Sequence, residues 1–323
     1  MPVSFDRDIV RVLLADVGGT NVRFAVLTKG VLGPVEHLAV RDYAQFGDAL
    51  AAFLQRQSEG GAIRSAILAV AGVVKGERCE LTNYPWMVDG AELRARFGFA
   101  AIRVINDFEA VAWSLPHLAR DGLRKLGGGE PVAGAPMLAL GPGTGLGVAA
   151  YVPGDGFVLR SEAGHATLPS GSPREDAIVE ILRHRFEHVS AERVLSGGGL
   201  ENLYCAIATL DQLIVPDRNA AAITQAALAD RCPTSRAALD TLCALLGEVA
   251  GNLALAFRAE GGVFIAGGIV AHLGDFLPRS QFRARFEAKG RFRGYLTAIP
   301  VYLILHGDPA FVGLRSLAMQ PAS

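Results

Sequence analysis

The stretch Leu13-Leu14-Ala15-Asp16-Val17-Gly18-Gly19-Thr20-Asn21 decides how the rest of the chain is organised. Apolar runs at Ile9–Ala15 and Val22–Leu27 flank it and predict two strands that meet at a Gly-Gly turn. Because neither glycine carries a Cβ, backbone N–H groups of this turn can come close to an anion and point at it. The threonine and asparagine that follow add side-chain donors at the same rim. The pattern therefore predicts a turn that binds phosphate.

Asp16 ends the first of these strands and offers a hard oxygen ligand. A magnesium ion carried by a nucleotide would sit there, bound through water, because Mg²⁺ keeps several of its waters when proteins bind it. A bare phosphate would repel the same carboxylate. A strand that ends in aspartate before a Gly-Gly hairpin is also common as a plain turn, so this stretch alone leaves both interpretations open.

The same design recurs in the second half of the chain. From Leu138 to Val152 an apolar strand, the turn Gly143-Thr144-Gly145 and a second apolar strand follow one another. Two such turns indicate a duplicated architecture in which each half grips phosphates from one side of a cleft. A third glycine pair, Gly267-Gly268, follows the apolar strand Val263–Ala266 and opens a helix at Ile269, which is a natural place for the adenosine part of a nucleotide.

Composition limits the class of protein. With 323 residues, of which 50% are hydrophobic, the chain can bury a large core, and its length favours two domains over one. The formal net charge is −1, with acids and bases interspersed, so the sequence shows no basic surface for nucleic acid and no polybasic membrane patch. Partners are therefore expected to be small molecules or other subunits.

Cysteine usage and apolar runs indicate the compartment. The four cysteines form no CxxC pair and no cluster with histidine, which argues against structural zinc and against disulfides. The longest apolar run, Leu242–Phe257, is interrupted by Glu248 and Asn252, and aspartates break up the N-terminal stretch. We therefore expect a cytoplasmic protein with no membrane segment.

Strands and helices alternate along the chain. Continuous apolar runs at Ile67–Val74 and Ile102–Ile105 predict strands that are buried on both faces. The alternation predicts an α/β protein with a largely parallel or mixed sheet. A domain boundary is expected near residue 110, and Gly197-Gly198-Gly199 is expected to separate one helix from the next, which would begin at Leu200.

Asn106-Asp107 stand where a predicted strand ends and a helix begins. An aspartate in that position is often only an N-cap. The functional interpretation is a general base: Asp107 would accept the proton of a substrate hydroxyl as it attacks a γ-phosphate, while Asn106 orients the same substrate. Both interpretations stay open on these two residues alone.

Three further polar residues lie among small residues. Glu162 and His165 belong to Ser161-Glu162-Ala163-Gly164-His165, which is either a ligand-binding loop or a solvated turn, and no third residue at suitable spacing makes it a metal site. Glu192 is either another ligand or a glutamate in the first turn of a helix. With Asn106 and Asp107, these residues form a set that can accept hydrogen bonds from the vicinal hydroxyls of a polyol. Such a set favours one specific sugar, because it rejects analogues that lack a hydroxyl.

Other catalytic motifs are absent from the sequence. Neither glycine turn has the lysine of GxxxxGK[ST], and Gly141–Gly147 has the wrong spacing for GxGxxG. No GxSxG occurs, which excludes the usual serine-hydrolase elbow.

Seven motifs occur in the order seen in bacterial ATP-dependent glucokinases, and from about Leu13 to Gly313 the chain resembles that family. The motifs are Asp16-Val-Gly-Gly-Thr-Asn21, Leu81-Thr-Asn-Tyr-Pro-Trp86, Val104-Ile-Asn-Asp-Phe108, Gly141-Pro-Gly-Thr-Gly-Leu-Gly147, Ser161-Glu-Ala-Gly-His165, His188-Val-Ser-Ala-Glu-Arg-Val-Leu-Ser-Gly197 and Gly262-Val-Phe-Ile-Ala-Gly-Gly-Ile-Val270. The cysteine cluster of the related zinc-binding repressor and kinase group is absent, so the resemblance is to the glucokinases without zinc.

The resemblance implies a two-domain, actin-like fold of the ribonuclease-H-like superfamily that closes over D-glucose. It also implies transfer of the γ-phosphate of Mg·ATP to the 6-hydroxyl of the sugar. The small domain would comprise residues 1–110, completed by a C-terminal helix at about residues 303–323, and the large domain would comprise residues 111–302. Members of this family are usually homodimers.

Carried over motif by motif, the resemblance assigns roles to the candidate residues. Asp107 would be the base, and glucose would be held by Asn106, Glu162, His165 and Glu192, with Asn83 in a loop that closes on the substrate. Nucleotide phosphates would lie against Ala15, Asp16, Val17, Gly18, Gly19, Thr20, Gly143, Thr144 and Gly145, with magnesium on Asp16 through water. The family more often has glycine on both sides of the glutamate, where this chain has Ser161 and Ala163.

Two alternatives accompany this interpretation. One is the same chemistry on another hexose, such as mannose or an amino sugar. The other is a sugar-binding regulator without catalysis, which would usually carry a DNA-binding helix-turn-helix, and we expect no room for one before Val12.

Overall fold

The computed structural model describes residues 11–57, 61–154 and 156–320. The chain divides into two compact units: unit 1 is built from residues up to Leu118 together with those from His306 onward, and unit 2 is Ala119–Leu305. The boundary expected near residue 110 falls inside a helix, and the division lies after Leu118. The first two residues of the predicted strand Ile9–Ala15 lie outside the described residues.

Unit 1 is built around a six-stranded sheet with the order β3-β2-β1-β5-β9, in which β4 also pairs with β2. Strands β1 and β2 form the predicted antiparallel hairpin, and β1, β5 and β9 run parallel. The run predicted at Ile67–Val74 forms β5 over Ser65–Val70, and all six of its residues are buried. The other strands are β1 (Arg11–Val17), β2 (Asn21–Thr28), β3 (Val31–Leu32), β4 (Glu36–Ala39) and β9 (Ala101–Asn106). A small antiparallel sheet adds β6 (Val74–Lys75), β7 (Arg78–Glu80) and β8 (Met87–Asp89).

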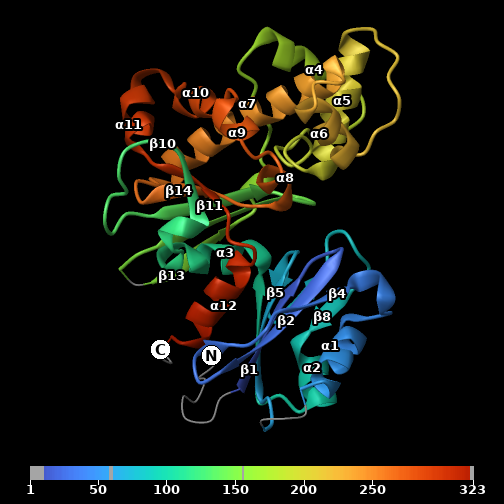
Figure 1. Cartoon of the computed structure of the whole chain (residues 1–323), viewed down its shortest axis with the longest axis vertical. Coiled ribbons are helices and arrows are strands. Elements are labelled where there is room, and N and C mark those ends of the chain that lie inside the picture. The colour runs from blue at the N-terminus through green and yellow to red at the C-terminus, as the bar shows by residue number, and fades with distance from the viewer. Residues whose placement is uncertain (1–10, 58–60, 155, 321–323) are drawn as a thin grey trace. The chain divides into compact units, whose positions relative to one another are not determined.

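Among its described residues, unit 1 has the α-helices α1 (Phe46–Gln55), α2 (Gly90–Phe97), α3 (Asp107–Ser114) and α12 (Pro309–Ala318). An aromatic core joins the sheet to α1, with the rings of Phe24 and Phe53 stacked at 5.0 Å between centroids. The C-terminal helix α12, red in Figure 1, lies beside the blue strand β1 and packs against α3. Gly313 allows this packing, because a Cβ there would overlap the carbonyl oxygen of Ala110 on α3.

Unit 2 repeats the arrangement of unit 1. Its sheet has the order β10-β15-β14-β11-β12-β13, in which β11 is antiparallel to β12 and parallel to β14. This is the relationship that β1 has to β2 and β5, so the duplicated strand-turn-strand design is confirmed. The strands are β10 (Leu123–Gly127), β11 (Met137–Pro142), β12 (Leu146–Val152), β13 (Phe157–Ser161), β14 (Gly262–Ile265) and β15 (Val301–Ile304).

Helix α7 (Pro233–Phe257) is the long central helix of unit 2. Among the described residues it is the single helix with the length and hydropathy to cross a membrane, but 67% of its most apolar window is buried inside the structure. It is therefore a core helix. The other helices of this unit are α4 (Pro173–Arg183), α5 (Gly197–Leu210), α6 (Ala220–Leu228), α8 (Gly268–Ala271), α9 (Phe276–Arg279), α10 (Phe282–Glu287) and α11 (Arg293–Ala298).

One expectation for unit 2 was wrong. The three glycines at 197–199 do not separate two helices, because they form the first turn of α5, capped by the side chain of Ser196. Glycine is tolerated in a first turn because the N–H groups there have no intrahelical partner. Gly199 is required by packing, since a Cβ there would overlap the backbone of Val194.

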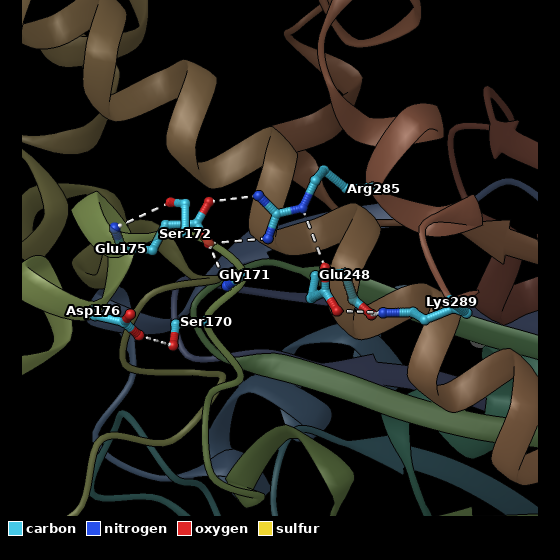
Figure 2. Close-up of polar contacts among 8 residues, drawn as sticks. All are labelled: Ser170, Gly171, Ser172, Glu175, Asp176, Glu248, Arg285 and Lys289. Atoms are coloured by element: carbon cyan, nitrogen blue, oxygen red, sulfur yellow. Dashed lines mark hydrogen bonds and ion pairs between the residues drawn. The ribbon is translucent and has the colours of Figure 1, made fainter. Parts of the chain in front are cut away.

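A charged network ties three helices of unit 2 together, and Figure 2 shows it in close-up. Arg285 on α10 contacts both oxygens of Glu175 on α4, at 2.7 and 2.9 Å, and reaches Glu248 on α7 at 3.1 Å. Lys289 pairs with the same Glu248. We call Glu175, Glu248, Arg285 and Lys289 the charged network. Its two acids and two bases balance, as half-buried and buried charges require.

Candidate functional site

The candidate residues of unit 1 gather at one edge of its sheet. Strands β1, β5 and β9 are parallel and in register at Val17, Val70 and Asn106, so their carboxyl ends coincide. This edge carries Asp16 near the end of β1, Asn106 at the end of β9 and Asp107 directly after it. Ligands of open α/β sheets bind outside the carboxyl ends of the strands. All three side chains therefore belong to the same edge of the sheet, and we call them the candidate site of unit 1.

The first glycine turn, residues 18–20, closes at the same edge. Gly18 donates its N–H to the carbonyl of Asn21 at 3.0 Å, and the carbonyl of Thr20 accepts from the N–H of Val40 at 3.1 Å. Asn83 lies against Gly19, because a Cβ on that glycine would come 3.5 Å from the Cβ of Asn83. The structure thus brings Asn83 to the turn, although the two are far apart in the sequence.

Asn106 holds the start of α3 in place. Its Oδ1 accepts from the N–H groups of Phe108 and Glu109 at 2.9 and 3.3 Å, and its Nδ2 donates to the carbonyl of Gly72 at 3.1 Å. The N-cap of α3 is therefore Asn106, and the alternative that Asp107 is the N-cap is wrong. Asp107 is the first residue of the helix and is half-buried.

Asp16 is buried, with 6% of its surface exposed, and is paired with Arg23, which lies opposite it on β2. The other arm of Arg23 contacts Oδ1 of Asp308 at 2.6 Å, just before α12. Burial raises the pKa of the Asp16 carboxyl above its ordinary value, although the charge of Arg23 opposes this.

Sequence reasoning missed both Arg23 and Asp308. A charged residue inside an apolar strand, paired across the hairpin with Asp16, is a signal that could have found Arg23. No local pattern points to Asp308, because it lies 285 residues from its partner.

The donor set at this edge fits a magnesium ion held mainly by water and substrate. The described residues contain no group of three His, Cys, Asp or Glu side chains able to hold a metal by themselves. Mg²⁺ is usually bound through one or two carboxylates plus substrate phosphates. Arg23 contacts Oδ2 of Asp16, and no hydrogen bond to Oδ1 comes from the part of the chain that the structure describes. Within the described residues, Oδ1 of Asp16 is the oxygen that would accept from a magnesium-bound water.

The second glycine turn, residues 143–145, joins β11 to β12 in unit 2. Gly143 donates its N–H to the carbonyl of Gly145 at 2.8 Å, and its own carbonyl accepts from the N–H of Gly197 at 2.9 Å. Gly267-Gly268 lie at the same edge, after the parallel strand β14. Gly267 has φ +103° and a Cβ there would overlap the carbonyl of Pro142, so glycine is required where these segments meet.

Glu192 is joined directly to this turn. Its Oε2 accepts from the backbone N–H of Leu146 at 2.8 Å, and a Cβ on Gly145 would overlap the same oxygen. Glu192 lies in a turn before the cap residue Ser196, so the alternative of a first-turn helix glutamate is wrong.

The loop with Glu162 and His165 is fastened to the segment with Glu192. The N–H of Glu192 donates to the carbonyl of Gly164 and the N–H of Ala191 to that of Ala166, both at 2.9 Å. Glu162 and His165 themselves are exposed. The candidate site of unit 2 therefore consists of Glu162, His165, Glu192 and the second glycine turn.

The side chain of Ser161, the last residue of β13, makes a local hydrogen bond across Glu162. Its Oγ accepts from the N–H of Ala163 at 3.1 Å, a bond that glycine cannot make. This bond restrains the backbone on both sides of Glu162. The prediction that the two glycine turns grip one nucleotide from both sides stays a prediction.

Comparison with known proteins identifies the family. The sequence profile described as glucokinase matches residues 13–321. The chain belongs to the glucokinase family. Curated glucokinases from Paramagnetospirillum magneticum and Nitrobacter hamburgensis are 47% and 42% identical to it over 315 and 311 residues. Each alignment covers 96% of this chain, with 98% and 97% of the relative.

A solved glucokinase supports the same conclusion. The crystal structure of glucokinase from an Antarctic psychrotroph matches with a TM-score of 0.84 and 33% identity, covering 95% of this chain and 98% of that one. The actin-like fold expected from the glucokinase resemblance is confirmed. The full-length match to curated glucokinases also makes the chain an enzyme of this family, an ATP:D-glucose phosphotransferase.

Proposed function

We propose that Asp107 is the general base that accepts the proton of the glucose 6-hydroxyl as this oxygen attacks the γ-phosphorus of ATP. The observation that carries the proposal is that Asp107 lies at the same carboxyl edge of the unit 1 sheet as Asp16 and the first glycine turn, with β5 between their strands. A base on that edge would face the side of the sheet where the phosphates and the magnesium ion would bind.

The other residues supply binding and orientation. Glucose hydroxyls would donate to Glu162 and Glu192 and bond to His165, with Asn83 closing on the sugar. Asn106 fixes the start of α3 through Oδ1, and its Nδ2 donates one N–H to the carbonyl of Gly72, so the second N–H would bond a glucose hydroxyl. Phosphoryl transfer passes through a loose transition state, so positioning of this kind supplies much of the catalysis.

The nucleotide would be held by the two glycine turns. Backbone N–H groups of Ala15–Thr20 and Gly143–Gly145 would donate to phosphate oxygens, and Gly267-Gly268 would lie against the adenosine. Asp16 would hold Mg²⁺ through water. When bound, the ion neutralises charge on the phosphate oxygens.

We further propose that the enzyme is a cytoplasmic homodimer. The glucokinase resemblance supports the dimer, and the absence of a disulfide or zinc pattern among its cysteines supports the compartment. Light scattering of the purified chain tests the dimer, because a monomer mass at micromolar concentration contradicts it.

A coupled assay of ADP release tests the reaction. Glucose, mannose and glucosamine are crossed with ATP and polyphosphate, with sugar phosphate measured in parallel. The proposal expects the highest kcat/KM for glucose with ATP. If another sugar or donor gives a higher kcat/KM, that compound is the preferred substrate and the proposal is wrong. If calorimetry detects sugar binding but no turnover occurs, the chain is a regulator.

A further inference from the structure

Arg23 bridges two carboxylates in unit 1, and the second of them has no role in the proposed function. Its Nη2 contacts Asp16 on β1, and its Nη1 contacts Oδ1 of Asp308 at 2.6 Å. Asp308 precedes α12, the C-terminal helix that lies beside β1 in Figure 1. One guanidinium thus joins the candidate magnesium ligand to the last helix of the unit.

The side chain of Asp308 is committed to Arg23 and not to its own helix. Asp308 is the N-cap residue of α12, yet it makes no capping hydrogen bond from its side chain. Asp89 in the same unit behaves differently, since its carboxylate accepts from the first N–H groups of α2. An N-cap aspartate that does not cap gives up a stabilising bond of about 1 kcal/mol. The direction of Asp308 toward Arg23 therefore calls for a reason other than helix stability.

Anchoring α12 does not supply that reason. Phe311, Leu314 and Leu317 of this helix are all buried, and Gly313 brings its backbone against α3. Burial of three large apolar side chains fixes the helix far more strongly than one half-exposed ion pair does. What the ion pair adds is a fixed orientation of the guanidinium, because the planar arginine fork holds both carboxylates at once.

We propose that Asp308 is a positioning residue for the nucleotide. It holds Arg23, and through Arg23 it holds Asp16 with one carboxylate oxygen turned toward the magnesium-bound water. This proposal rests on the proposed function, in which Asp16 receives Mg·ATP. Groups that orient a metal-binding carboxylate typically change metal affinity or activity by about 10–100-fold when they are removed.

The first test is Asp308→Asn, measured against Asp89→Asn. The control is closely matched, because Asp89 is also an N-cap aspartate of unit 1 and also pairs with an arginine, Arg78, at 3.1 Å. Asn can keep the side-chain cap of α2 at position 89, and at position 308 there is no side-chain cap to lose. Asp308→Asn is expected to raise KM for Mg·ATP by about 10-fold or more, with KM for glucose nearly unchanged. Asp89→Asn is expected to change neither constant.

A split between the two KM values is the decisive readout, because a merely structural role would move both together. If Asp308→Asn leaves KM for Mg·ATP unchanged, or raises both KM values equally, the proposal is overturned. The same holds if Asp89→Asn reproduces the split.

If Asp308→Asn does not fold, Arg23→Lys is measured in its place. Lysine retains the charge but cannot hold two carboxylates with one planar fork, so the same split is expected. Where both variants fold, the double variant Arg23→Lys/Asp308→Asn should bind Mg·ATP no more weakly than Arg23→Lys alone. Both substitutions break the same connection, from Asp308 through Arg23 to Asp16. Additive losses would contradict the connection.

Calorimetry of Mg·ADP binding separates this proposal from the proposed function. Wild type is expected to bind Mg·ADP about 10-fold or more tightly than Asp308→Asn, and this needs no sugar phosphorylation. If wild type fails to phosphorylate glucose but this difference appears, the proposed function fails and the role of Asp308 stands. If wild type and Asp308→Asn both phosphorylate glucose and bind Mg·ADP with equal affinity, the role of Asp308 is wrong and the proposed function stands.

Discussion

The backbone N–H of Leu146 donates a 2.8 Å hydrogen bond to Oε2 of Glu192. This bond joins a proposed glucose ligand to the first residue of β12, the strand that follows the second glycine turn. A change in the turn that displaces the carboxylate of Glu192 is therefore expected to weaken glucose binding.

Gly145→Ala tests that connection. The added Cβ would overlap Oε2 of Glu192, and because this atom ends a flexible side chain, the glutamate is expected to rotate away at little cost in stability. Loss of a charge-assisted hydrogen bond to glucose costs about 1.5–3 kcal/mol, so KM for glucose should rise roughly 10- to 100-fold. Glu192→Gln should raise it as well without altering the turn. Gly294→Ala is the control, because a Cβ there meets no described atom within 4 Å outside its own helix and chain neighbours. If Gly145→Ala raises only KM for ATP and leaves KM for glucose unchanged, the argument is contradicted.

Asp107→Ala tests the base. General base catalysis contributes about 10²- to 10⁴-fold, so kcat should fall by that factor while glucose affinity, measured by calorimetry, falls less. The thermal unfolding temperature serves as the check on folding: Asn106 is the N-cap of α3, but the N–H of Phe108 also donates to Oδ1 of Asp107 at 2.9 Å, and the variant loses that bond. ADP release close to that of wild type would show that another group takes the proton.

The sequence was sufficient to predict those parts of the fold that depend on a local pattern. The glycine turns, the apolar strands before them and Asn106-Asp107 at a strand end are local features, and the structure has each of them. The expectation for the three glycines at 197–199 was wrong because glycine usually weakens helices, whereas here all three lie in the first turn of α5 and close packing on Val194 requires glycine at position 199. Asp308 was missed for a different reason, since its partner Arg23 is brought to it only when the C-terminal helix packs into unit 1.

Glu175→Gln tests the charged network in Figure 2. The substitution removes one of two carboxylates and leaves Arg285 and Lys289 to share Glu248. Breaking a buried pair in this way is expected to lower the free energy of unfolding by about 3 kcal/mol, as measured by urea denaturation. Asp240→Asn is the control, because its pair with Arg236 is exposed and should contribute about 0.5 kcal/mol or less. Equal effects of the two variants would show that the network adds no special stability.

The same glutamate predicts a pH dependence. Burial acts to raise the pKa of Glu175, but hydrogen bonds from Arg285 and from the N–H of Gly171 outweigh it and hold the pKa below its ordinary value of 4.5. The carboxylate therefore stabilises the fold fully above about pH 5, and this stability is lost as pH falls through 4.5 toward the lower folded-state pKa. Denaturation curves between about pH 6 and 3 should show a flatter acid decline in Glu175→Gln than in wild type. Parallel declines would assign the acid sensitivity to other groups.

Gly313→Ala tests the contact between α12 and α3. The new Cβ would overlap the backbone carbonyl of Ala110, and since backbone cannot turn aside, the two helices must separate. Overpacking of this kind costs about 1–3 kcal/mol, and kcat should fall because α3 begins with Asp107. Gly294→Ala again provides the comparison. Unchanged stability together with unchanged kcat would mean that the helices are not locked together.

The return of α12 to unit 1 sets an order of events during synthesis. The ribosome makes β1 and α3 early, then the whole of unit 2, and only afterwards the helix that supplies Phe311, Leu314 and the Asp308 partner of Arg23. Unit 2 is contiguous and can complete its core first, whereas the nascent unit 1 waits with apolar surface of its sheet uncovered. The half of the enzyme that is begun first is therefore the half that is finished last, and its sheet stays uncovered for longer while translation proceeds.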